Sequence, residues 1–166
     1  MNIEKNMYFS QKFLVYLYKK FTKHPDYIMY KSVRIHRKYR IAKENNSKVK
    51  SLFYSFFANR ISSKYNLELY GKFGKNFRIW HGNIIINGNA VIGDNCNLHG
   101  NNCIGEKNGK SPIIGDNVDV GYGTTIIGDV TIANNVVIGA NSLVNKSFYE
   151  EGVVIAGCPA RIIKKI

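Results

Sequence analysis

The sequence predicts a parallel β-solenoid with a triangular cross-section over residues 66–166, preceded by a basic helical region over residues 1–65. Two observations predict this fold: an aliphatic residue returns at every sixth position late in the chain, and nearly all of the net charge of +13 lies before residue 66. The 166 residues suffice for one domain with a small appendage. An apolar content of 45%, with 15 Gly and 3 Pro, excludes a collagen-like repeat and a wholly disordered chain.

Residues 1–65 are expected to form two or three amphipathic helices. This segment contains 15 Lys and Arg but only 3 acidic residues, whereas residues 66–166 contain 9 basic and 8 acidic ones. Aromatic and basic side chains are interleaved, as in 13–21 and 53–60, which is typical of helices that pack one apolar face. Two interpretations stay open: contact with an anionic partner such as a membrane surface, and an ordinary solvated helical face. No recognisable nucleic-acid-binding module is present.

The cysteines and the hydropathy pattern favour a cytoplasmic protein, with peripheral contact at the inner face of the membrane as one option. Cys96, Cys103 and Cys158 form neither an even set nor a C-x-x-C pair, so we expect no disulfide framework and no zinc knuckle. No apolar stretch approaches the roughly 20 residues that span a bilayer, and the charged N-terminal residues do not resemble a signal peptide.

The six-residue repeat is the strongest signal in the chain. A period of six fits neither an α-helix nor a two-residue strand alternation. It fits a solenoid in which each hexapeptide is a short strand plus a corner and three hexapeptides complete a coil, with coils stacked at roughly 4.8 Å. Glycines after the aliphatic residues are expected to supply positive φ angles at the corners. The aliphatic residues in register are Ile86, Ile92, Leu98, Ile104, Ile114, Val120, Ile126, Ile132, Ile138 and Val144.

Two interruptions of the repeat point to functional residues. The step from Ile104 to Ile114 is four residues too long, so residues 106–112 should project as a loop. Its Lys107 and Lys110 are candidates to bind a phosphate or a sugar acid, the alternative being a tolerated polar insertion. A second slip, one residue long, falls beside residues 80–83, which include His81.

Residues 66–166 resemble the hexapeptide-repeat acyltransferases. The closing segment 154–163 is similar to the terminal G-x-P-A-[KR] signature of that family, and residues 81–88 resemble the start of the coils in its serine acetyltransferase-like branch, with one residue fewer. The resemblance implies a left-handed β-helix, acetyl-CoA as the acyl donor, no metal, and a homotrimer with sites between neighbouring solenoids.

The resemblance also implies which residues form the site. An acceptor hydroxyl needs a base to remove its proton, and His81 takes that position, with Glu68 as its carboxylate partner. His24 and His36 lie in basic helical surroundings and are expected to be structural or solvated. The positions expected to bind the acceptor are Trp80, Asn83, His99, Lys107 and Lys110. The positions implied for coenzyme A are Gly121, Tyr122, Gly123, Gly139, Ala140, Ala160, Arg161 and Lys164.

The favoured function is an O-acetyltransferase acting on a sugar hydroxyl of a capsular or lipopolysaccharide-type surface polysaccharide or its precursor. Serine O-acetylation is the alternative, although the second histidine of that branch is absent from residues 109–115. A γ-type carbonic anhydrase would need three histidines, and the repeats contain only His81 and His99. A non-catalytic trimeric scaffold is the remaining alternative.

Overall fold

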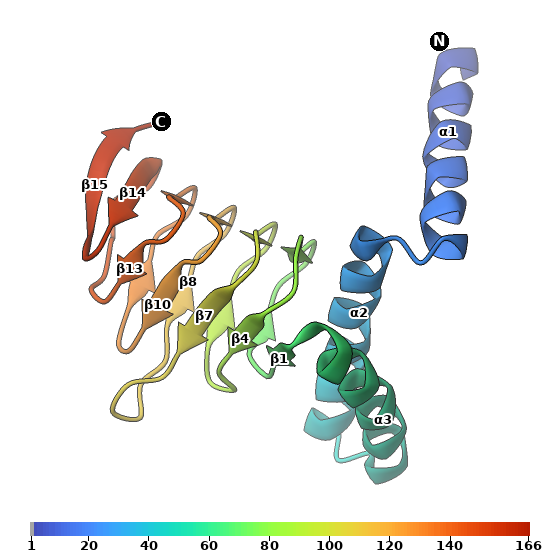
Figure 1. The fold of residues 1–166 in the computed structure, drawn as a ribbon, viewed down its shortest axis with the longest axis horizontal. Helices are drawn as coiled ribbons and strands as arrows, with labels where there is room; N and C mark the ends of the chain where they lie inside the picture. The colour runs from blue at the N-terminus through green and yellow to red at the C-terminus, as the bar shows by residue number, and fades with distance from the viewer. Residues whose placement is uncertain (1) are drawn as a thin grey trace.

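The computed structural model describes the backbone of residues 2–166 and the side chains from residue 12 onward. Three helices, α1 (Asn2–Phe21), α2 (Pro25–Glu44) and α3 (Lys48–Tyr65), precede a stack of short strands wound into a three-sided prism (Figure 1). Almost all neighbouring strands are parallel, so the chain rises by one coil between partners. The structure therefore has the solenoid and the N-terminal helical region that the sequence predicts.

Each wall of the prism is one sheet, and up to β13 successive strands go to successive walls. Sheet A contains β1 (Leu67–Leu69), β4 (Ile84–Ile86), β7 (Asn102–Gly105), β10 (Thr125–Ile127) and β13 (Leu143–Val144). Sheet B contains β2 (Lys72–Phe73), β5 (Val91–Ile92), β8 (Ile113–Ile114) and β11 (Thr131–Ile132). Sheet C contains β3 (Arg78–Ile79), β6 (Asn97–Leu98), β9 (Asp119–Val120), β12 (Val137–Ile138), β14 (Val153–Gly157) and β15 (Ala160–Lys165).

The aliphatic repeat forms the core of the prism. All ten residues of the predicted register are at most 2% exposed, and each stacks on its equivalent in the next coil, as Ile104 does on Ile126. Burying one such side chain contributes about 1.5–3 kcal/mol, so the column is the main source of stability. The inward orientation predicted from the spacing is confirmed at every one of these positions.

The corners are built differently from the prediction. The glycines that follow the aliphatic residues do not adopt positive φ angles; a Cβ on Gly93 would lie 2.6 Å from the Gly115 carbonyl oxygen, so close contact between coils excludes a side chain there. Left-handed backbone falls instead on asparagines two residues later, such as Asn95 and Asn117. Their side-chain amides hydrogen-bond from coil to coil, with 3.1 Å between Asn95 Nδ2 and Asn117 Oδ1.

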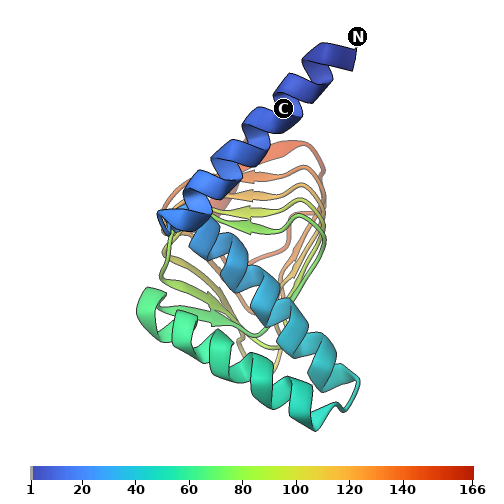
Figure 2. The ribbon, with the colours of Figure 1, turned by 90° about the vertical axis from the view of Figure 1, so that its right-hand side faces the viewer.

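Helices α2 and α3 cover the first coil, as the view along the prism shows (Figure 2). Met29 and Val33 of α2 are buried and join the same apolar core as Phe77. The two helices are joined by His36, whose Nδ1 lies 2.9 Å from the Ser32 carbonyl oxygen and whose Nε2 lies 3.1 Å from Ser62 Oγ. The helical region thus closes one end of the β-helix.

Strand β15 closes the other end, because it runs antiparallel to β14. The turn between them contains the cis peptide bond before Pro159. Among the described residues, no helix combines the length and the apolar content that crossing a membrane would require.

Candidate active site

The corner between sheets C and A carries His81. The register pairs Ile79 with Leu98 and Leu98 with Val120, so His81, Gly100 and Tyr122 occupy equivalent corner positions in three successive coils. A Cβ on Gly100 would lie 2.7 Å from His81 Cβ and 3.0 Å from the Tyr122 ring. The absence of a side chain at residue 100 therefore makes room for the exposed imidazole on one side and the phenol on the other.

Buried polar side chains hold the backbone of this corner in place. Asn102 accepts a hydrogen bond from the Gly100 N–H at 2.8 Å and donates one to the Gly121 carbonyl at 2.8 Å. One coil further, Thr124 Oγ1 donates to the Gly139 carbonyl at 3.0 Å. Because these partners lie inside the prism, the corner is a rigid support for the side chains outside it.

A second imidazole lies next to this corner. His99 Nε2 is 2.6 Å from Asp119 Oδ1 on the neighbouring coil, and the Trp80 ring stacks on the His99 ring with centroids 6.3 Å apart. The side chains of His99 and Asp119 are 43% and 41% exposed. The structure therefore provides a carboxylate-oriented imidazole that solvent and substrate can reach.

Glu68, the carboxylate predicted to partner His81, lies on the outer face of sheet A. It borders a shallow depression that also includes Asn83 and Cys103, and its charge, together with the larger effect of burial, raises the pKa of the Cys103 thiol. The hydrogen bonds and ion pairs of the described residues include none between Glu68 and His81. Their pairing therefore stays a prediction.

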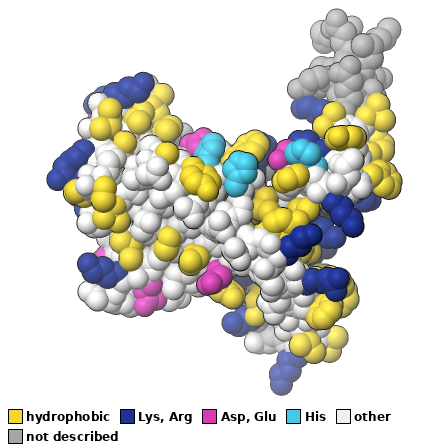
Figure 3. All heavy atoms as spheres, in the orientation of Figure 1, with side chains coloured by type: hydrophobic (Ala, Val, Ile, Leu, Met, Phe, Trp, Pro, Cys, Tyr) yellow, Lys and Arg dark blue, Asp and Glu magenta, His cyan; other side chains and the backbone are white. Residues whose placement is uncertain are grey.

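The His81 imidazole has a small electrostatic effect on a carboxylate of helix α2, that of Asp26. The pKa of Asp26 is lowered chiefly by a hydrogen bond from Lys19, with smaller contributions from His24 and His81, while partial burial acts in the opposite direction. His24 itself caps α2, its Nδ1 accepting from the Asp26 N–H at 3.3 Å. His24 and His36 thus have structural contacts. Figure 3 shows histidine side chains on the face where the β-helix joins the helical region.

The residues implied for coenzyme A extend from this corner toward the C-terminus. Gly121, Tyr122 and Gly123 follow β9 at the corner, and Gly139 and Ala140 occupy the same corner one coil later. The remaining positions, Ala160, Arg161 and Lys164, lie on β15 of the adjoining sheet. The structure places these residues in one strip, and their role in binding stays a prediction.

The loop of residues 106–112 projects from the corner between sheets A and B, a different edge from that of His81 (Figure 1). Lys107 and Lys110 form a tight turn, and the Lys110 ammonium pairs with Asp129 at 2.5 Å. In one protomer these lysines are remote from His81. Asn83 accepts a hydrogen bond from Asn66 at 2.9 Å beside the His81 corner.

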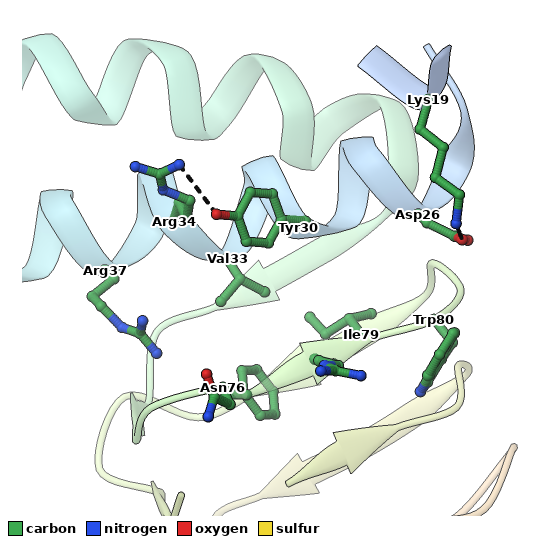
Figure 4. Close-up of a pocket in the computed structure, with 11 residues that line it drawn as sticks. Lys19, Asp26, Tyr30, Val33, Arg34, Arg37, Asn76, Ile79 and Trp80 are labelled. Atoms are coloured by element: carbon green, nitrogen blue, oxygen red, sulfur yellow. Dashed lines mark hydrogen bonds and ion pairs between the residues drawn. The ribbon is translucent and has the colours of Figure 1, made fainter. Parts of the chain in front are cut away.

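A cleft of about 530 Å³ lies between helix α2 and strand β3 and reaches Trp80 (Figure 4). Its lining includes Lys19, Tyr30, Arg34 and Arg37 from the helices. The sequence did not predict this cleft, because the cleft depends on how α2 docks on the first coil. It did not predict the role of Asp119 either, because the pairing of neighbouring coils was applied only to the aliphatic residues of the repeat. The coil register alone would have placed Asp119 near His99.

Among the described side chains, no three of His, Cys, Asp and Glu are grouped as metal ligands.

Relatives of known sequence match somewhat more than half of the chain. No family model matches. A serine acetyltransferase of Staphylococcus epidermidis is 38% identical over 99 residues, which cover 57% of this chain and 46% of the relative. A serine acetyltransferase of Staphylococcus aureus is 36% identical over 99 residues, which again cover 57% of this chain and 46% of the relative. The chain thus spans about half the length of the curated relatives it matches.

Solved structures extend the similarity to the helical region. A serine acetyltransferase of Brucella abortus has a TM-score of 0.73 at 24% identity, over 83% of this chain and 57% of that one. A serine O-acetyltransferase of Brucella melitensis has a TM-score of 0.72 at 23% identity, over 98% and 70%. A serine acetyltransferase in complex with CoA has a TM-score of 0.69 at 23% identity, over 80% and 55%. The walls described above therefore form a left-handed, hexapeptide-repeat β-helix of the serine acetyltransferase type.

Proposed function

We propose that this protein is an acetyl-CoA-dependent O-acetyltransferase whose reaction takes place at the corner of His81, Gly100 and Tyr122. The observation that carries the proposal is an exposed imidazole on a rigid corner of this type of β-helix. The solved serine acetyltransferase with bound CoA supports coenzyme A as the acyl carrier. The strip from Gly121 to β15 is the proposed location of coenzyme A.

The chemistry requires one base near the acceptor. The acceptor hydroxyl attacks the carbonyl carbon of the acetyl thioester while an imidazole removes its proton. The new C–O bond forms, the C–S bond breaks, and the coenzyme A sulfur leaves and takes up the proton as a thiol. His81 is the proposed base; His99 is the second candidate, because Asp119 is placed to fix its tautomer and stabilise its protonated form.

Two acceptors are proposed, and different observations favour them. The names of the relatives favour L-serine. A sugar hydroxyl of a surface polysaccharide or its precursor is favoured by the basic, aromatic cleft beside Trp80, which is described further below. Acetyl transfer from acetyl-CoA to L-serine and to a panel of sugars, measured by mass spectrometry of the products, decides between them.

The assignment of the base is tested with His81→Gln, His99→Gln and Asp119→Asn. A positioned general base contributes about 10² to 10⁴ in rate, so we expect His81→Gln to reduce kcat by that factor while the others reduce it less. His24→Asn is the matched control, because asparagine keeps an acceptor at the start of α2. If His99→Gln and Asp119→Asn lose activity and His81→Gln keeps it, the base is His99. Full activity in all three variants contradicts a reaction at this corner.

The assembly and its location are also proposals. We propose a homotrimer, since among the described residues no hydrogen bond or ion pair joins the two predicted catalytic side chains of one protomer. We propose a cytoplasmic location in which the basic helical region touches the anionic inner face of the membrane; exposed Phe13, Leu14 and Phe21 on α1 support such a contact.

A further inference from the structure

We propose that the cleft between α2 and β3 binds the anionic group of the acceptor, a phosphate or carboxylate carried by a sugar, and so presents a sugar hydroxyl to the His81 corner. This inference rests on the proposed O-acetyltransferase function. It names the acceptor class that the lining of the cleft fits.

The cleft has an excess of positive charge. Lys19, Arg34, Arg37 and Arg78 line it, and the single carboxylate in the lining belongs to Asp26. The Lys19 ammonium already pairs with that carboxylate at 2.5 Å. Three guanidinium groups therefore face a common space without a carboxylate partner among the described residues. An anion in the cleft would relieve their mutual repulsion.

The guanidinium groups keep donors free for a ligand. Arg34 uses Nη1 to donate to the Tyr30 hydroxyl at 3.2 Å, and Arg37 uses Nη2 to donate to the Gly74 carbonyl. The Arg78 guanidinium has no hydrogen bond or ion pair within the part of the chain that the structure describes; only the backbone N–H of this residue donates, to the Cys96 carbonyl. A guanidinium carries five N–H donors in a planar fork that suits the oxygens of phosphate and carboxylate. Arginines on both α2 and β3 therefore keep N–H donors available to an anion in the cleft.

The remaining lining suits a sugar ring. Tyr30 and Trp80 bring aromatic faces to the cleft, and its volume of about 530 Å³ lies within the usual range for small-molecule sites (Figure 4). Trp80 borders the cleft on one side and stacks on His99 on the other. A ligand held here therefore extends toward the two imidazoles rather than away from them.

The same lining fits a free amino acid poorly. L-Serine carries an ammonium group, which needs a carboxylate or several acceptors, and the Asp26 carboxylate is occupied by Lys19. The phosphates of coenzyme A are another possible anion. Their proposed strip ends at β15 in the last coil, however, whereas the cleft lies at the first coil, on the opposite end of the prism.

Calorimetric titration of the full chain tests binding independently of activity. The probes are glucose 1-phosphate, glucuronate, glucose and inorganic phosphate. We expect at least one anionic sugar to bind at least tenfold more tightly than both glucose and inorganic phosphate. Comparing the affinities of glucose 1-phosphate and glucuronate shows whether the cleft prefers a phosphate or a carboxylate. We expect the Arg34→Gln/Arg78→Gln variant to lose at least tenfold of this affinity. The control is Lys50→Gln/Arg60→Gln on α3, which removes the same charge outside the cleft and should bind as the parent does.

Several results would overturn the inference. These are no binding of either anionic sugar, equal binding of glucose or inorganic phosphate, or unchanged affinity in the Arg34→Gln/Arg78→Gln variant. Steady-state kinetics provide a second test. We expect the Arg34→Gln/Arg78→Gln variant to have a higher KM for the anionic acceptor and an unchanged KM for acetyl-CoA. The reverse pattern would assign the cleft to coenzyme A. If the binding pattern holds but no acetyl transfer occurs, the anion site stands and the proposed enzymatic function fails.

Discussion

Gly100 is the residue whose backbone most directly shapes the candidate site. It combines a φ of +124° with contacts so close that a Cβ would overlap with His81 Cβ and the Tyr122 ring. An alanine here would be strained by its conformation and would also push the imidazole aside. The effect of backbone strain can be separated from that of displacing the imidazole, because an alanine at Gly109 would be strained without touching a neighbouring side chain.

We predict that Gly100→Ala lowers kcat at least tenfold and destabilises the fold by about 1–3 kcal/mol. Gly109→Ala is the matched control: Gly109 also has a positive φ, but a Cβ there would meet nothing within 4 Å. It should lose stability to a similar extent and retain activity. Acetyl transfer and urea denaturation are measured for both variants. Equal activity of the two would show that His81 tolerates displacement or is not needed.

At the scale of elements, the packing of α2 on α3 depends on a buried histidine. His36 is 5% exposed, and burial lowers its pKa below the ordinary 6.5, an effect that the bond to the Ser32 carbonyl partly offsets. The folded state therefore favours the neutral ring, whereas the unfolded chain binds a proton as the pH falls below 6.5. The stabilisation is fully present above that pH and is lost as the pH falls toward the lowered pKa.

We predict that the free energy of unfolding decreases between pH 7 and pH 5, by at most about 1.4 kcal/mol per pH unit from this one group. His36→Gln should have a shallower slope over the same range, although it is less stable at pH 7. Urea denaturation at several pH values measures both slopes. Identical slopes for the two proteins would rule out His36 as the cause.

The sequence predicts the elements of the β-helix better than the site. The period of six specifies which side chains point inward, since an error by one position would bury polar residues such as Asp119 and Arg78. Spacing cannot specify what comes together outside the prism. The pairing of His99 with Asp119 depends on contacts between coils, and the cleft depends on how α2 docks on β3. Asparagines such as Asn95 and Asn117 follow the glycines as turn formers in the sequence, but the positive φ angles were assigned to the glycines, whereas the asparagines adopt them.

At the scale of the whole molecule, the residues predicted to form the site are spread over more than one edge of the prism. No hydrogen bond or ion pair joins Glu68 and His81 among the described residues, and Lys107 and Lys110 lie on another edge than His81. Residues from neighbouring prisms would complete the site if the edges of three protomers meet.

We predict that the protein is a homotrimer with a mass about three times the 18.9 kDa of one chain. Light scattering after size-exclusion chromatography measures the mass. Specific activity should fall on dilution in parallel with dissociation of the trimer. A monomer that retains full activity at every concentration would place all the catalytic groups on one chain.

The two closed ends of the prism have a consequence for solubility. A stack of parallel coils exposes unpaired backbone groups at its first and last turns, and such edges can template the addition of further chains. Here α2 and α3 cover the first coil, and the reversed strand β15 pairs with β14 at the last. Loss of either cover would turn the β-helix into a seed for end-to-end filaments, so truncated forms should polymerise where the intact chain stays dispersed.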